Sequence, residues 1–446
     1  MRVITYGTYD LFHEGHRRLL ERAKELGDYL IVAVTTENFD DARGKLNVQQ
    51  SLMDRVRNVQ DSGLADEVII EEYEGQKIND IQKYGVDIFA IGSDWLGHFD
   101  YLNDYCKVVY LERTKGVSST QLRNEAGLLR LGVVGTGRIA HRFVEEALYV
   151  SGVDVTGVWS RTPQNVQDFA DKHDLDFGAA DYDELLEKSD GVYIATPHPT
   201  HEEYIRRALE AGCHVLSEKP MTLSAAATTD LFDLAAERDL VLLEAVKTAF
   251  APGFARMVAV ARSGSIGQIR SVDATFTKLE QGDLREFDPE QGGGSLSELA
   301  SYPLLAIVKL LGEDHVDQRT VSFMPADREV ETFSRIDLQY PHAVASARTG
   351  LGVKAEGDLI VAGTRGYLYV PAPWWKTEYF EVRFENPADN KKYYFKFDGD
   401  GLRYEIAEFS SMIRRGERNT FKLRRSESEW MAQVIETARS NATTFG

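Results

Sequence analysis

The segment between Ser118 and Ala140 constrains the fold of this chain more than any other part. Residues 118–126 have the hydroxyl-rich start of a short helix, and residues 128–134 form an apolar strand that runs into the glycine-rich turn of residues 135–140. A capped helix start and a glycine turn after a strand are two different devices for binding phosphate. We therefore expect two nucleotide-binding units, one on each side of Gly127, joined without a linker.

Composition limits the possible functions. A chain of 446 residues is too long for one hydrophobic core, so two or three domains are expected. The 43% hydrophobic and 27% charged content is typical of globular rather than disordered chains. The net charge of -20 argues against a nucleic-acid partner, because phosphate backbones are bound by basic surfaces.

The sequence also indicates the compartment. Cys106 and Cys213 are the only cysteines, too few for a disulfide framework, which favours a reducing environment. A strand-like run already begins at Val3, so no signal peptide is expected. No apolar run approaches the roughly 20 residues that span a bilayer. We expect a soluble, cytoplasmic protein with no membrane partner.

The first unit alternates strands with helices. This order predicts a parallel sheet with right-handed crossovers, and ligands then bind at the carboxyl ends of the strands. The predicted strands are residues 2–6, 29–35, 86–91 and 108–111, and a helix is predicted over residues 16–26.

Two stretches at strand ends supply groups for an anion. By themselves, His13 and His16 could be half of a metal site or two surface residues. The run from Gly7 to His16 follows a strand and opens a helix, so its imidazoles and free N–H groups converge where an anion would bind. A second stretch adds a guanidinium, a glycine turn and hydroxyl caps through Arg113, Thr114, Gly116, Ser118, Ser119 and Thr120. Together these groups predict a triphosphate site.

These motifs resemble the glycerol-3-phosphate cytidylyltransferase family of the HxGH nucleotidyltransferase superfamily, over nearly all of residues 1–127. Residues 43–45, Arg55, residues 66–69 and residues 92–95 also match the family pattern. The resemblance implies an HxGH Rossmann-like domain in which an acceptor phosphate attacks the α-phosphorus of CTP and releases pyrophosphate, with Mg²⁺ bound to CTP. No covalent intermediate is needed, so catalysis depends on positioning and charge stabilisation.

The resemblance also implies residue roles. The phosphate charge would be stabilised by His13, His16, Lys45 and Arg113. The nucleotide would be bound by Thr8, Tyr9, Asp94, Trp95, Thr114, Gly116, Ser118, Ser119 and Thr120. The acceptor phosphate would be bound by Arg43 and Lys77. One position departs from the pattern, because Gly63 stands where the family usually has an arginine. Loss of that planar phosphate-binding group suggests an acceptor other than, or broader than, glycerol 3-phosphate.

The second unit begins with a dinucleotide-binding pattern. The strand of residues 128–134 leads into a G-x-G-x-x-A turn that contains Gly135, Gly137, Arg138 and Ile139. The next strand, residues 155–159, ends in Ser160 and Arg161 rather than in an acidic residue. A hydroxyl and a guanidinium suit a 2′-phosphate, so NADP is favoured over NAD; alternatively, Arg161 faces solvent.

The ends of further predicted strands contain candidate active-site residues of this unit. Predicted strands end at residues 195–197, which include Thr196 and Pro197, and at Glu218, Lys219 and Pro220. These segments, together with the glycine turn, His201 and residues 292–303, resemble the Gfo/Idh/MocA oxidoreductase family from about residue 128 to the C-terminus. The family often has aspartate and histidine where this chain has Glu298 and Tyr302. The resemblance implies an NAD(P)-dependent oxidoreductase with Thr196, Pro197, Glu218 and Lys219 close to the nicotinamide.

Two candidates remain for the proton donor to a carbonyl. Glu298 and Tyr302 are four residues apart and share one helix face. A nearby Lys219 would stabilise a Tyr302 phenolate and make the tyrosine a donor. Alternatively, Lys219 is itself the donor and Tyr302 only packs. Lys247, which follows the predicted strand of residues 240–243, is expected either to bind a substrate phosphate or to be a solvated surface lysine.

The last part of the chain changes to alternating polar and apolar segments. They predict an antiparallel sheet in an α+β domain, from residues 271–276, 332–339, 344–349, 358–362 and 379–384. The aromatic runs of residues 374–376 and 393–395 are expected on sheet faces, and helices over residues 405–415 and 427–440 are expected to pack back on the domain. In the resembled family such a sheet often forms a dimer interface, so a homodimer is expected.

The sequence therefore predicts three domains: an α/β cytidylyltransferase domain over residues 1–127, an α/β NADP-binding Rossmann domain over residues 128–250, and an α+β substrate and dimerisation domain over residues 251–446. The predicted function is bifunctional. Reduction of a small ketose or ketose phosphate with NADPH would supply a polyol, and cytidylyl transfer would convert its phosphate to a CDP-polyol such as CDP-glycerol or CDP-ribitol, for cell-surface polymers. The alternative is a cytidylyltransferase whose second half only binds NADP, as a sensor or dimerisation module.

Overall fold

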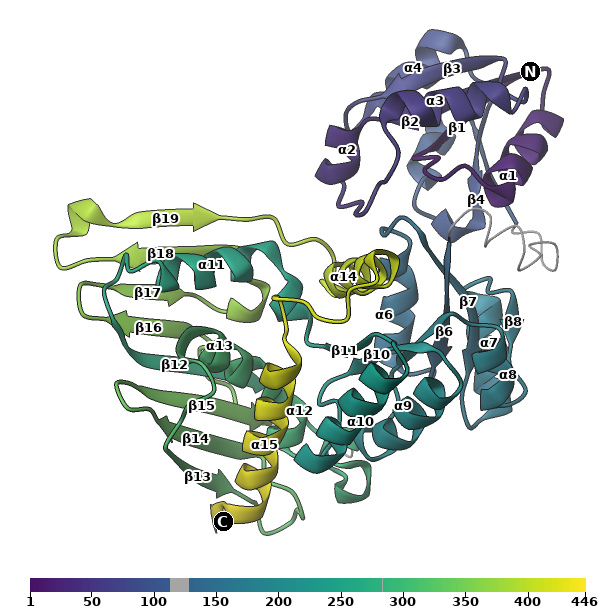
Figure 1. The fold of residues 1–446 in the computed structure, drawn as a ribbon. Coiled ribbons are helices and arrows are strands. Elements are labelled where there is room, and N and C mark those ends of the chain that lie inside the picture. The colour runs from purple at the N-terminus through teal and green to yellow at the C-terminus, as the bar shows by residue number, and fades with distance from the viewer. Residues whose placement is uncertain (113–127, 283) are drawn as a thin grey trace. The chain divides into compact units, whose positions relative to one another are not determined.

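The computed structural model describes residues 1–112, 128–282 and 284–446 (Figure 1). The chain divides into two compact units, residues 1–191 and 192–446, and each is described by itself. The predicted phosphate-binding helix start around Ser118 lies outside the described residues. The predicted domain boundaries at residues 127 and 250 stay predictions.

The first unit opens with a five-stranded parallel sheet, as predicted. Its strand order is β3-β2-β1-β4-β5, so the first strand of the chain lies in the middle. The three middle strands, β2, β1 and β4, are buried along most of their length, whereas the edge strands β3 and β5 are only half-buried. β3 was not predicted as a strand. The strands are β1 (Arg2–Gly7), β2 (Tyr29–Thr35), β3 (Glu67–Glu71), β4 (Ile88–Gly92) and β5 (Lys107–Leu111), and the helices are α1 (Glu14–Glu25), α2 (Glu37–Ala42), α3 (Leu52–Asp61) and α4 (Gln76–Tyr84).

A second set of parallel strands follows in the same unit. β6 pairs with β7, and β7 pairs with the short β8. The turn after β6 leads directly into α6, which is the strand–turn–helix order that the glycine pattern predicts. The elements are β6 (Leu129–Val134), α6 (Arg138–Ala147), β7 (Val153–Trp159), α7 (Pro163–Lys172), β8 (Phe177–Gly178) and α8 (Tyr182–Glu187).

The second unit starts with further strand–helix repeats. β9 (Gly191–Ile194) begins at the division between the units, and β10 pairs in parallel with β11. The predicted strand ends are confirmed within one to three residues. The elements that follow β9 are α9 (His201–Glu210), β10 (His214–Glu218), α10 (Ala225–Glu237), β11 (Leu242–Ala245) and α11 (Pro252–Arg262).

The rest of the second unit is a nine-stranded sheet that is mainly antiparallel, as predicted, but two of its strand pairs are parallel. Its order is β19-β18-β17-β16-β12-β15-β14-β13-β20, and the pairs β12–β15 and β13–β20 are parallel. The chain leaves β12 through α12 and α13 and returns through the β13–β14–β15 meander, so β15 runs in the same direction as β12. The strands are β12 (Ile269–Lys278), β13 (Asp317–Phe323), β14 (Phe333–Gln339), β15 (Val344–Leu351), β16 (Leu359–Gly363), β17 (Tyr367–Val370), β18 (Tyr379–Arg383), β19 (Lys391–Tyr394) and β20 (Thr443–Phe445).

Helices α12 (Ser295–Leu299) and α13 (Ser301–Leu311) pack on the middle of this sheet, against β12, β14 and β15. The closing helices are confirmed as α14 (Leu402–Arg415) and α15 (Arg425–Asn441). Among the described residues, Pro289–Leu311 alone is long and apolar enough to cross a membrane, but 89% of its apolar window is buried inside the protein. That burial is what the core helix of a globular domain shows.

One aromatic run is placed differently from the prediction. Trp374 and Trp375 lie in a 3₁₀ turn (Trp374–Lys376) instead of on a strand, between Pro373 and a left-handed Thr377. The Trp374 indole is fully buried and donates a 2.8 Å hydrogen bond to the Thr275 carbonyl. Proline has no N–H for a strand ladder, which explains why the chain turns here.

Candidate active sites

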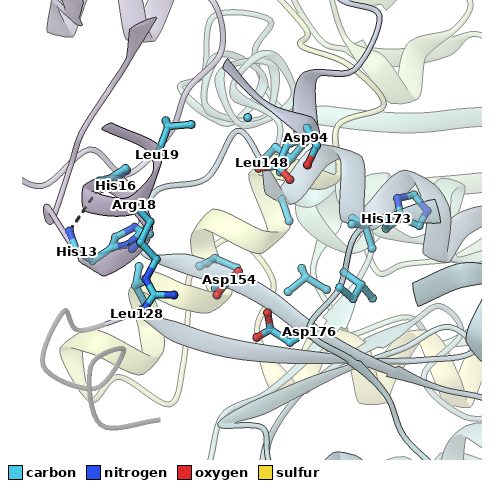
Figure 2. Close-up of a pocket in the computed structure, with 18 of the residues that line it drawn as sticks. His13, His16, Arg18, Leu19, Asp94, Leu128, Leu148, Asp154, His173 and Asp176 are labelled. Carbon is cyan, nitrogen blue, oxygen red and sulfur yellow. Dashed lines mark hydrogen bonds between the residues drawn. The ribbon is translucent and has the colours of Figure 1, made fainter. Parts of the chain in front are cut away.

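The first predicted site lies at the carboxyl end of β1. His13 caps α1, where its Nδ1 accepts a 3.1 Å hydrogen bond from the Gly15 N–H. The rings of His13 and His16 stack with centroids 3.9 Å apart, and the His13 N–H points to Nδ1 of His16 at 3.4 Å (Figure 2). Both rings line a cavity of about 330 Å³. The helix start therefore places two imidazoles beside this cavity, while the cap occupies the N–H groups of Gly15 and His13.

His16 is neutral in this arrangement. Burial, followed by the neighbouring charges of His13 and Lys45, holds the pKa of His16 well below its usual range. A triphosphate would oppose this effect, because a nearby negative charge favours the protonated imidazole. Lys45 and Asp94, two further predicted residues, line the same cavity.

Tyr9 and Thr8 support the turn rather than open toward solvent. The Tyr9 side chain is 1% exposed, belongs to the sheet core and meets the His16 ring edge-on at 5.4 Å. Its backbone is left-handed, with a φ of 54°. The Thr8 hydroxyl donates to Asp40 at 3.0 Å and accepts from Arg43 Nη2 at 2.6 Å. Any nucleotide contact of Tyr9 would therefore come from its main chain.

A buried charge cluster holds this turn in place. Arg55 is fully buried and donates from Nη1 to the carbonyls of Thr8 and Thr35, both at 2.9 Å. The same Nη1 lies 3.3 Å from Oδ2 of Asp40, which is 1% exposed. Arg43 pairs with Oδ1 of Asp40 at 2.8 Å. Sequence reasoning matched Arg55 to a family pattern, but it missed Asp40, whose role depends on contacts between distant segments.

The expected acceptor cations are both paired. Lys77 forms a close ion pair with Glu71, and its Nζ lies 4.5 Å from the centre of the Tyr6 ring. Burial lowers the pKa of Lys77 and raises the pKa of Glu71, and the pairing opposes both shifts. Gly63 is exposed and has a φ of 69°, a left-handed conformation that favours glycine over the arginine usual in the resembled family.

The remaining parts of the predicted nucleotide site are only partly described. Asp94 and Trp95 lie in the turn after β4, and Trp95 packs against Phe99 at 6.0 Å between ring centres. No group of three or more metal-ligating side chains occurs among residues 1–112, 128–282 and 284–446. The residues predicted in the second phosphate-binding stretch, Arg113, Thr114, Gly116, Ser118, Ser119 and Thr120, lie outside the described residues.

The predicted dinucleotide turn has the expected form. Gly135 has a φ of 107°, which only glycine adopts freely, and its N–H donates to the Trp159 carbonyl at 2.8 Å. Gly137 caps α6, and the space over its α-carbon is open. This open helix start fits a dinucleotide pyrophosphate. Arg138 and Ile139 begin α6.

The residues that follow β7 form a tight turn at the protein surface. The Ser160 hydroxyl accepts from the Thr162 N–H at 3.4 Å, so it closes a tight turn at the end of the strand. Arg161 is exposed. Its guanidinium is therefore accessible to a ligand, and the predicted role of Arg161 in cofactor choice stays a prediction.

In the second unit, the ends of β9 and β10 are tied together. The two ring nitrogens of the fully buried His201 lie 2.8 Å from the Thr196 carbonyl and 3.0 Å from the Pro220 carbonyl. Glu218 accepts a 2.6 Å hydrogen bond from the Tyr193 hydroxyl. His201 thus positions two predicted segments, Thr196–Pro197 and Lys219–Pro220, at one edge of the strands.

Glu298 lies at the centre of the predicted reaction site. Lys219 Nζ donates to the main-chain carbonyl of Glu298 at 3.0 Å. The Glu298 carboxylate is 7% exposed and faces Arg285 through two contacts, Nη1–Oε1 at 3.0 Å and Nη2–Oε2 at 3.2 Å. Nδ1 of the buried His198 lies 3.6 Å from Oε1. The structure therefore brings Lys219 and Glu298 together and adds two residues, Arg285 and His198, that no sequence pattern singled out.

Tyr302 lies in a different electrostatic environment from the one expected. It is 9% exposed and packs edge-on against Phe276, with ring centres 4.9 Å apart. Burial, followed by the carboxylates of Glu218, Glu405 and Glu298, raises the pKa of Tyr302 above its ordinary value. These negative charges disfavour a phenolate, whereas the expected stabilisation of a Tyr302 phenolate requires a nearby positive charge.

Lys247 is not a solvated surface lysine. It is partly buried at the start of a 3₁₀ turn (Lys247–Phe250), where its Nζ donates to the Asp400 carbonyl at 2.6 Å. Burial lowers its pKa, while the charges of Glu405, Asp400 and Glu218 oppose that shift. The other interpretation, a substrate contact by Lys247, stays a prediction.

Three family models match the chain. Residues 4–125 match a model described as cytidylyltransferase-like. Residues 129–246 match the oxidoreductase family with an NAD-binding Rossmann fold, and residues 254–369 match the GFO/IDH/MocA C-terminal domain.

Curated relatives match each part separately. Glycerol-3-phosphate cytidylyltransferase of Bacillus spizizenii is 50% identical over 128 residues, which are 29% of this chain and 98% of that protein. Trans-1,2-dihydrobenzene-1,2-diol dehydrogenase of Bos taurus is 30% identical over 322 residues, which are 70% of this chain and 96% of that protein. Both resemblances inferred from the sequence motifs are confirmed.

A solved structure supports the fold of the larger part. KijD10, a 3-ketoreductase from Actinomadura kijaniata in complex with NADP and TDP-benzene, has a TM-score of 0.66 and 25% identity. The similarity covers 71% of this chain and 99% of KijD10. The predicted Rossmann fold followed by a C-terminal sheet domain is confirmed, apart from the mixed strand directions.

The buried arginine beside Asp40 generates a stability prediction. Replacing Arg55 by Met leaves a buried carboxylate with fewer partners, so the free energy of unfolding should fall by about 3–5 kcal/mol. The matched control is Arg57→Met in the same helix. Arg57 is 66% exposed with a 3.6 Å partner, Asp54, so its replacement should change the free energy by less than about 0.5 kcal/mol.

Hydrogen exchange measured on peptides from β1 and β2 reports this local stability without interference from the rest of the chain. Equal exchange in the two variants would contradict the importance of the buried arginine.

Proposed function

Because residues 4–125 belong to the cytidylyltransferase-like family and the chain from residue 129 belongs to the Gfo/Idh/MocA oxidoreductase family, we propose that this bifunctional enzyme makes a CDP-polyol. The second activity reduces a small ketose or ketose phosphate with NADPH, and the first transfers CMP from CTP to the phosphate of the resulting polyol. The observation that carries the proposal is the presence of both sets of motifs in one chain. A reductase produces the kind of alcohol whose phosphate a cytidylyltransferase activates.

The cytidylyl transfer is a direct displacement. An acceptor phosphate oxygen attacks the α-phosphorus of CTP, the bond to the β-phosphate oxygen breaks, and pyrophosphate leaves. His13 and His16 would hold phosphate oxygens at the start of α1, and Lys45 in the same cavity would neutralise charge. Mg²⁺ is expected to accompany CTP. Products such as CDP-glycerol or CDP-ribitol would then serve cell-surface polymers.

The acceptor is proposed to be broader than glycerol 3-phosphate. Gly63 lacks the guanidinium usual at its place, and its left-handed backbone disfavours a replacement by arginine. Arg43 and Lys77 are the acceptor cations that remain, although both already have carboxylate partners. A longer polyol phosphate with more hydroxyl groups would recover binding energy through contacts beyond the phosphate.

For the reduction, NADPH supplies a hydride to the carbonyl carbon, and the chain supplies the proton for the oxygen. We favour Lys219 as the donor over Tyr302. The ammonium group of Lys219 is held by the Glu298 carbonyl, which leaves its other protons available. The three carboxylates around Tyr302 oppose formation of its phenolate, so the tyrosine is a poorer acid in this environment.

NADP is the proposed cofactor. The exposed Arg161 at the end of β7 can pair with a 2′-phosphate, and Ser160 beside it can donate a hydroxyl hydrogen bond. The similar ketoreductase KijD10 was solved with NADP. A lower KM for NADPH than for NADH would support the assignment, and a preference for NADH would contradict it.

Two alternatives remain testable beside this proposal. In the first, the oxidoreductase-like half binds NADP without catalysis, as a sensor or dimerisation module. The expected homodimer is supported by three exposed apolar residues on three strands of the large sheet, Val321, Val344 and Tyr367, and light scattering would measure it.

In the second alternative, reduction follows cytidylyl transfer and acts on the CDP-linked ketose. The TDP-benzene bound to KijD10 favours a nucleotide-linked substrate.

Coupled turnover tests the function and the order of steps. The enzyme is given CTP and a panel of polyol phosphates, with pyrophosphate release as the measurement. It is then given CTP, NADPH and ketose phosphates, with NADPH oxidation and the CDP-linked product followed together. We expect the highest kcat/KM for a polyol phosphate other than glycerol 3-phosphate. NADPH oxidation that strictly requires CTP would support the reverse order, and no oxidation with any carbonyl would support the non-catalytic alternative.

The first histidine motif yields a prediction for the transferase. Replacing His16 by Ala should lower kcat of pyrophosphate release by about 10²–10³-fold, as for other lost groups that stabilise transition-state charge. NADPH oxidation by the same preparation is the control, because it should not change. A loss below tenfold would make His16 a structural residue of the helix cap.

The two candidate donors yield a prediction for the reductase. Lys219→Met should lower kcat of carbonyl reduction by about 10²–10⁴-fold, the usual contribution of a general acid. Tyr302→Phe should cost less than about tenfold, because the ring packing against Phe276 is kept. Lys392→Met, an exposed lysine of β19, is the control for loss of one positive charge. The reverse ranking of the first two variants would assign the proton to Tyr302.

A further inference from the structure

The carboxylate of Glu298 is held from a loop that no sequence motif includes. Arg285 lies in the short 3₁₀ turn Arg285–Phe287, and its two terminal nitrogens meet the two carboxylate oxygens at 3.0 and 3.2 Å. Nη2 donates a hydrogen bond to Oε2, and Nη1 lies at ion-pair distance from Oε1, so the guanidinium holds the carboxylate toward this turn. The main chain of the same glutamate accepts from Lys219. Glu298 thus links Arg285 to the proposed proton donor.

We propose that Arg285 is a positioning residue for the reduction: its guanidinium holds the Glu298 carboxylate, so that the carboxylate does not pair with Lys219 and Lys219 stays on the Glu298 carbonyl. The inference rests on the proposed reductase function. Arg285 itself would not contact the reacting atoms.

The alternative partners of the carboxylate explain why a guanidinium is needed. Glu298 is 7% exposed, so its charge is costly without a cation in contact. If Arg285 were absent, the nearest cationic candidates would be His198, with Nδ1 3.6 Å from Oε1, and Lys219, which already contacts the Glu298 main chain. Pairing with Lys219 would draw the donor away from its carbonyl, and pairing with His198 would require an additional proton.

His198 is kept neutral in the native arrangement. Its Nδ1 also lies 3.3 Å from the Gly292 carbonyl, so a neutral ring with a proton on Nδ1 satisfies that acceptor. Burial holds the pKa of His198 well below its usual range, and the charges of Lys219, His201 and Arg285 act in the same direction. Glu298 is the carboxylate that faces it, and Glu286 lies 4.0 Å from Arg285. Removing the guanidinium therefore takes away one cation and leaves one anion beside the ring.

This environment predicts how pH affects a variant without the guanidinium. In Arg285→Gln, His198 should bind a proton at a higher pH than in the wild type, because one neighbouring cation is removed and the Glu298 carboxylate beside the ring favours protonated histidine. The donor arrangement would then be lost as the pH falls. An acid limb absent from the wild type should appear in the kcat profile between about pH 5 and 8.

The kinetic experiment compares Arg285→Gln, Arg285→Lys and Arg319→Gln in the full-length protein. Arg319 is 83% exposed and pairs with Asp317 at 3.3 Å, so its replacement is a matched loss of a surface arginine. We expect kcat of NADPH-dependent reduction to fall about 10–100-fold in Arg285→Gln with KM for NADPH unchanged. Arg285→Lys should recover part of the rate, since it restores the charge without the two-point contact. Wild-type rate and pH profile in Arg285→Gln would overturn the proposal.

Chemical rescue separates positioning from general support of the fold. Added guanidinium should raise kcat of Arg285→Gly and move its acid limb back toward the wild-type profile, but it should have no such effect on Arg319→Gln. Pyrophosphate release from CTP by each variant confirms that the rest of the chain is intact. Rescue of rate without movement of the acid limb would show a merely structural role and overturn the proposal.

A measurement without turnover distinguishes this inference from the proposed function. The NMR titration of the His198 ring, assigned with His198→Gln, should show a higher pKa in Arg285→Gln than in the wild type. If the wild-type protein reduces no carbonyl but the His198 titration shifts as expected, the reductase function fails while the electrostatic link stands. An unchanged titration would overturn the proposed link, whatever the activity.

Discussion

The cost of burying a charged group away from water organises both catalytic parts of this protein. In the transferase part, the fully buried Arg55 and the nearly buried Asp40 share contacts with the turn that follows β1. In the oxidoreductase part, the buried Glu298 pairs with the partly exposed Arg285, and its main-chain carbonyl accepts a hydrogen bond from Lys219 after the end of β10. A buried carboxylate without its cation would take up a proton or move. In both places this requirement fixes main-chain segments that would otherwise be surface turns.

These ion pairs bear on whether the second part is catalytic. A buried ion pair is weak evidence for stability, since well-packed apolar side chains of similar size can serve as well. Arg285 and Glu298 lie next to Lys219 and His198, and the glutamate contacts the lysine through its main chain. A module that only bound a cofactor or a second subunit would have no evident use for such an arrangement. The placement of this pair beside Lys219 and His198 favours an enzyme over a sensor.

The sequence predicted those features that depend on local patterns. Apolar strands followed by glycine turns identified the parallel sheets and the start of α6, because that pattern and its geometry are both encoded within a few residues. The mixed direction of the large sheet was missed, since β12 and β15 pair across about seventy residues of chain. Trp374 was expected on a sheet face, but it lies in a 3₁₀ turn because the prolines beside it cannot donate to a strand ladder.

The candidate sites divide in the same way. His13, His16, Lys219 and Glu298 were predicted because each belongs to a recognisable motif at a strand end or a helix start. Asp40, His198 and Arg285 were not, since their partners come from other segments and no spacing rule connects them. The electrostatic environment of Tyr302 depends on Glu218 and Glu405, which are far from it in sequence. The residues of a motif can therefore be predicted from the sequence, whereas the charged groups that surround the motif are known only from the three-dimensional structure.

Glutamate instead of the usual aspartate at position 298 follows from this geometry. Its main-chain carbonyl must stay within reach of Lys219 while its carboxylate meets a guanidinium in a separate loop. The side chain of glutamate is one methylene longer than that of aspartate, so it can extend the carboxylate toward Arg285 without moving the helix that holds the carbonyl. With aspartate, either the two-point contact would lengthen or α12 would have to shift. The glutamate at position 298, where the family often has aspartate, is thus explained by its contact with Arg285.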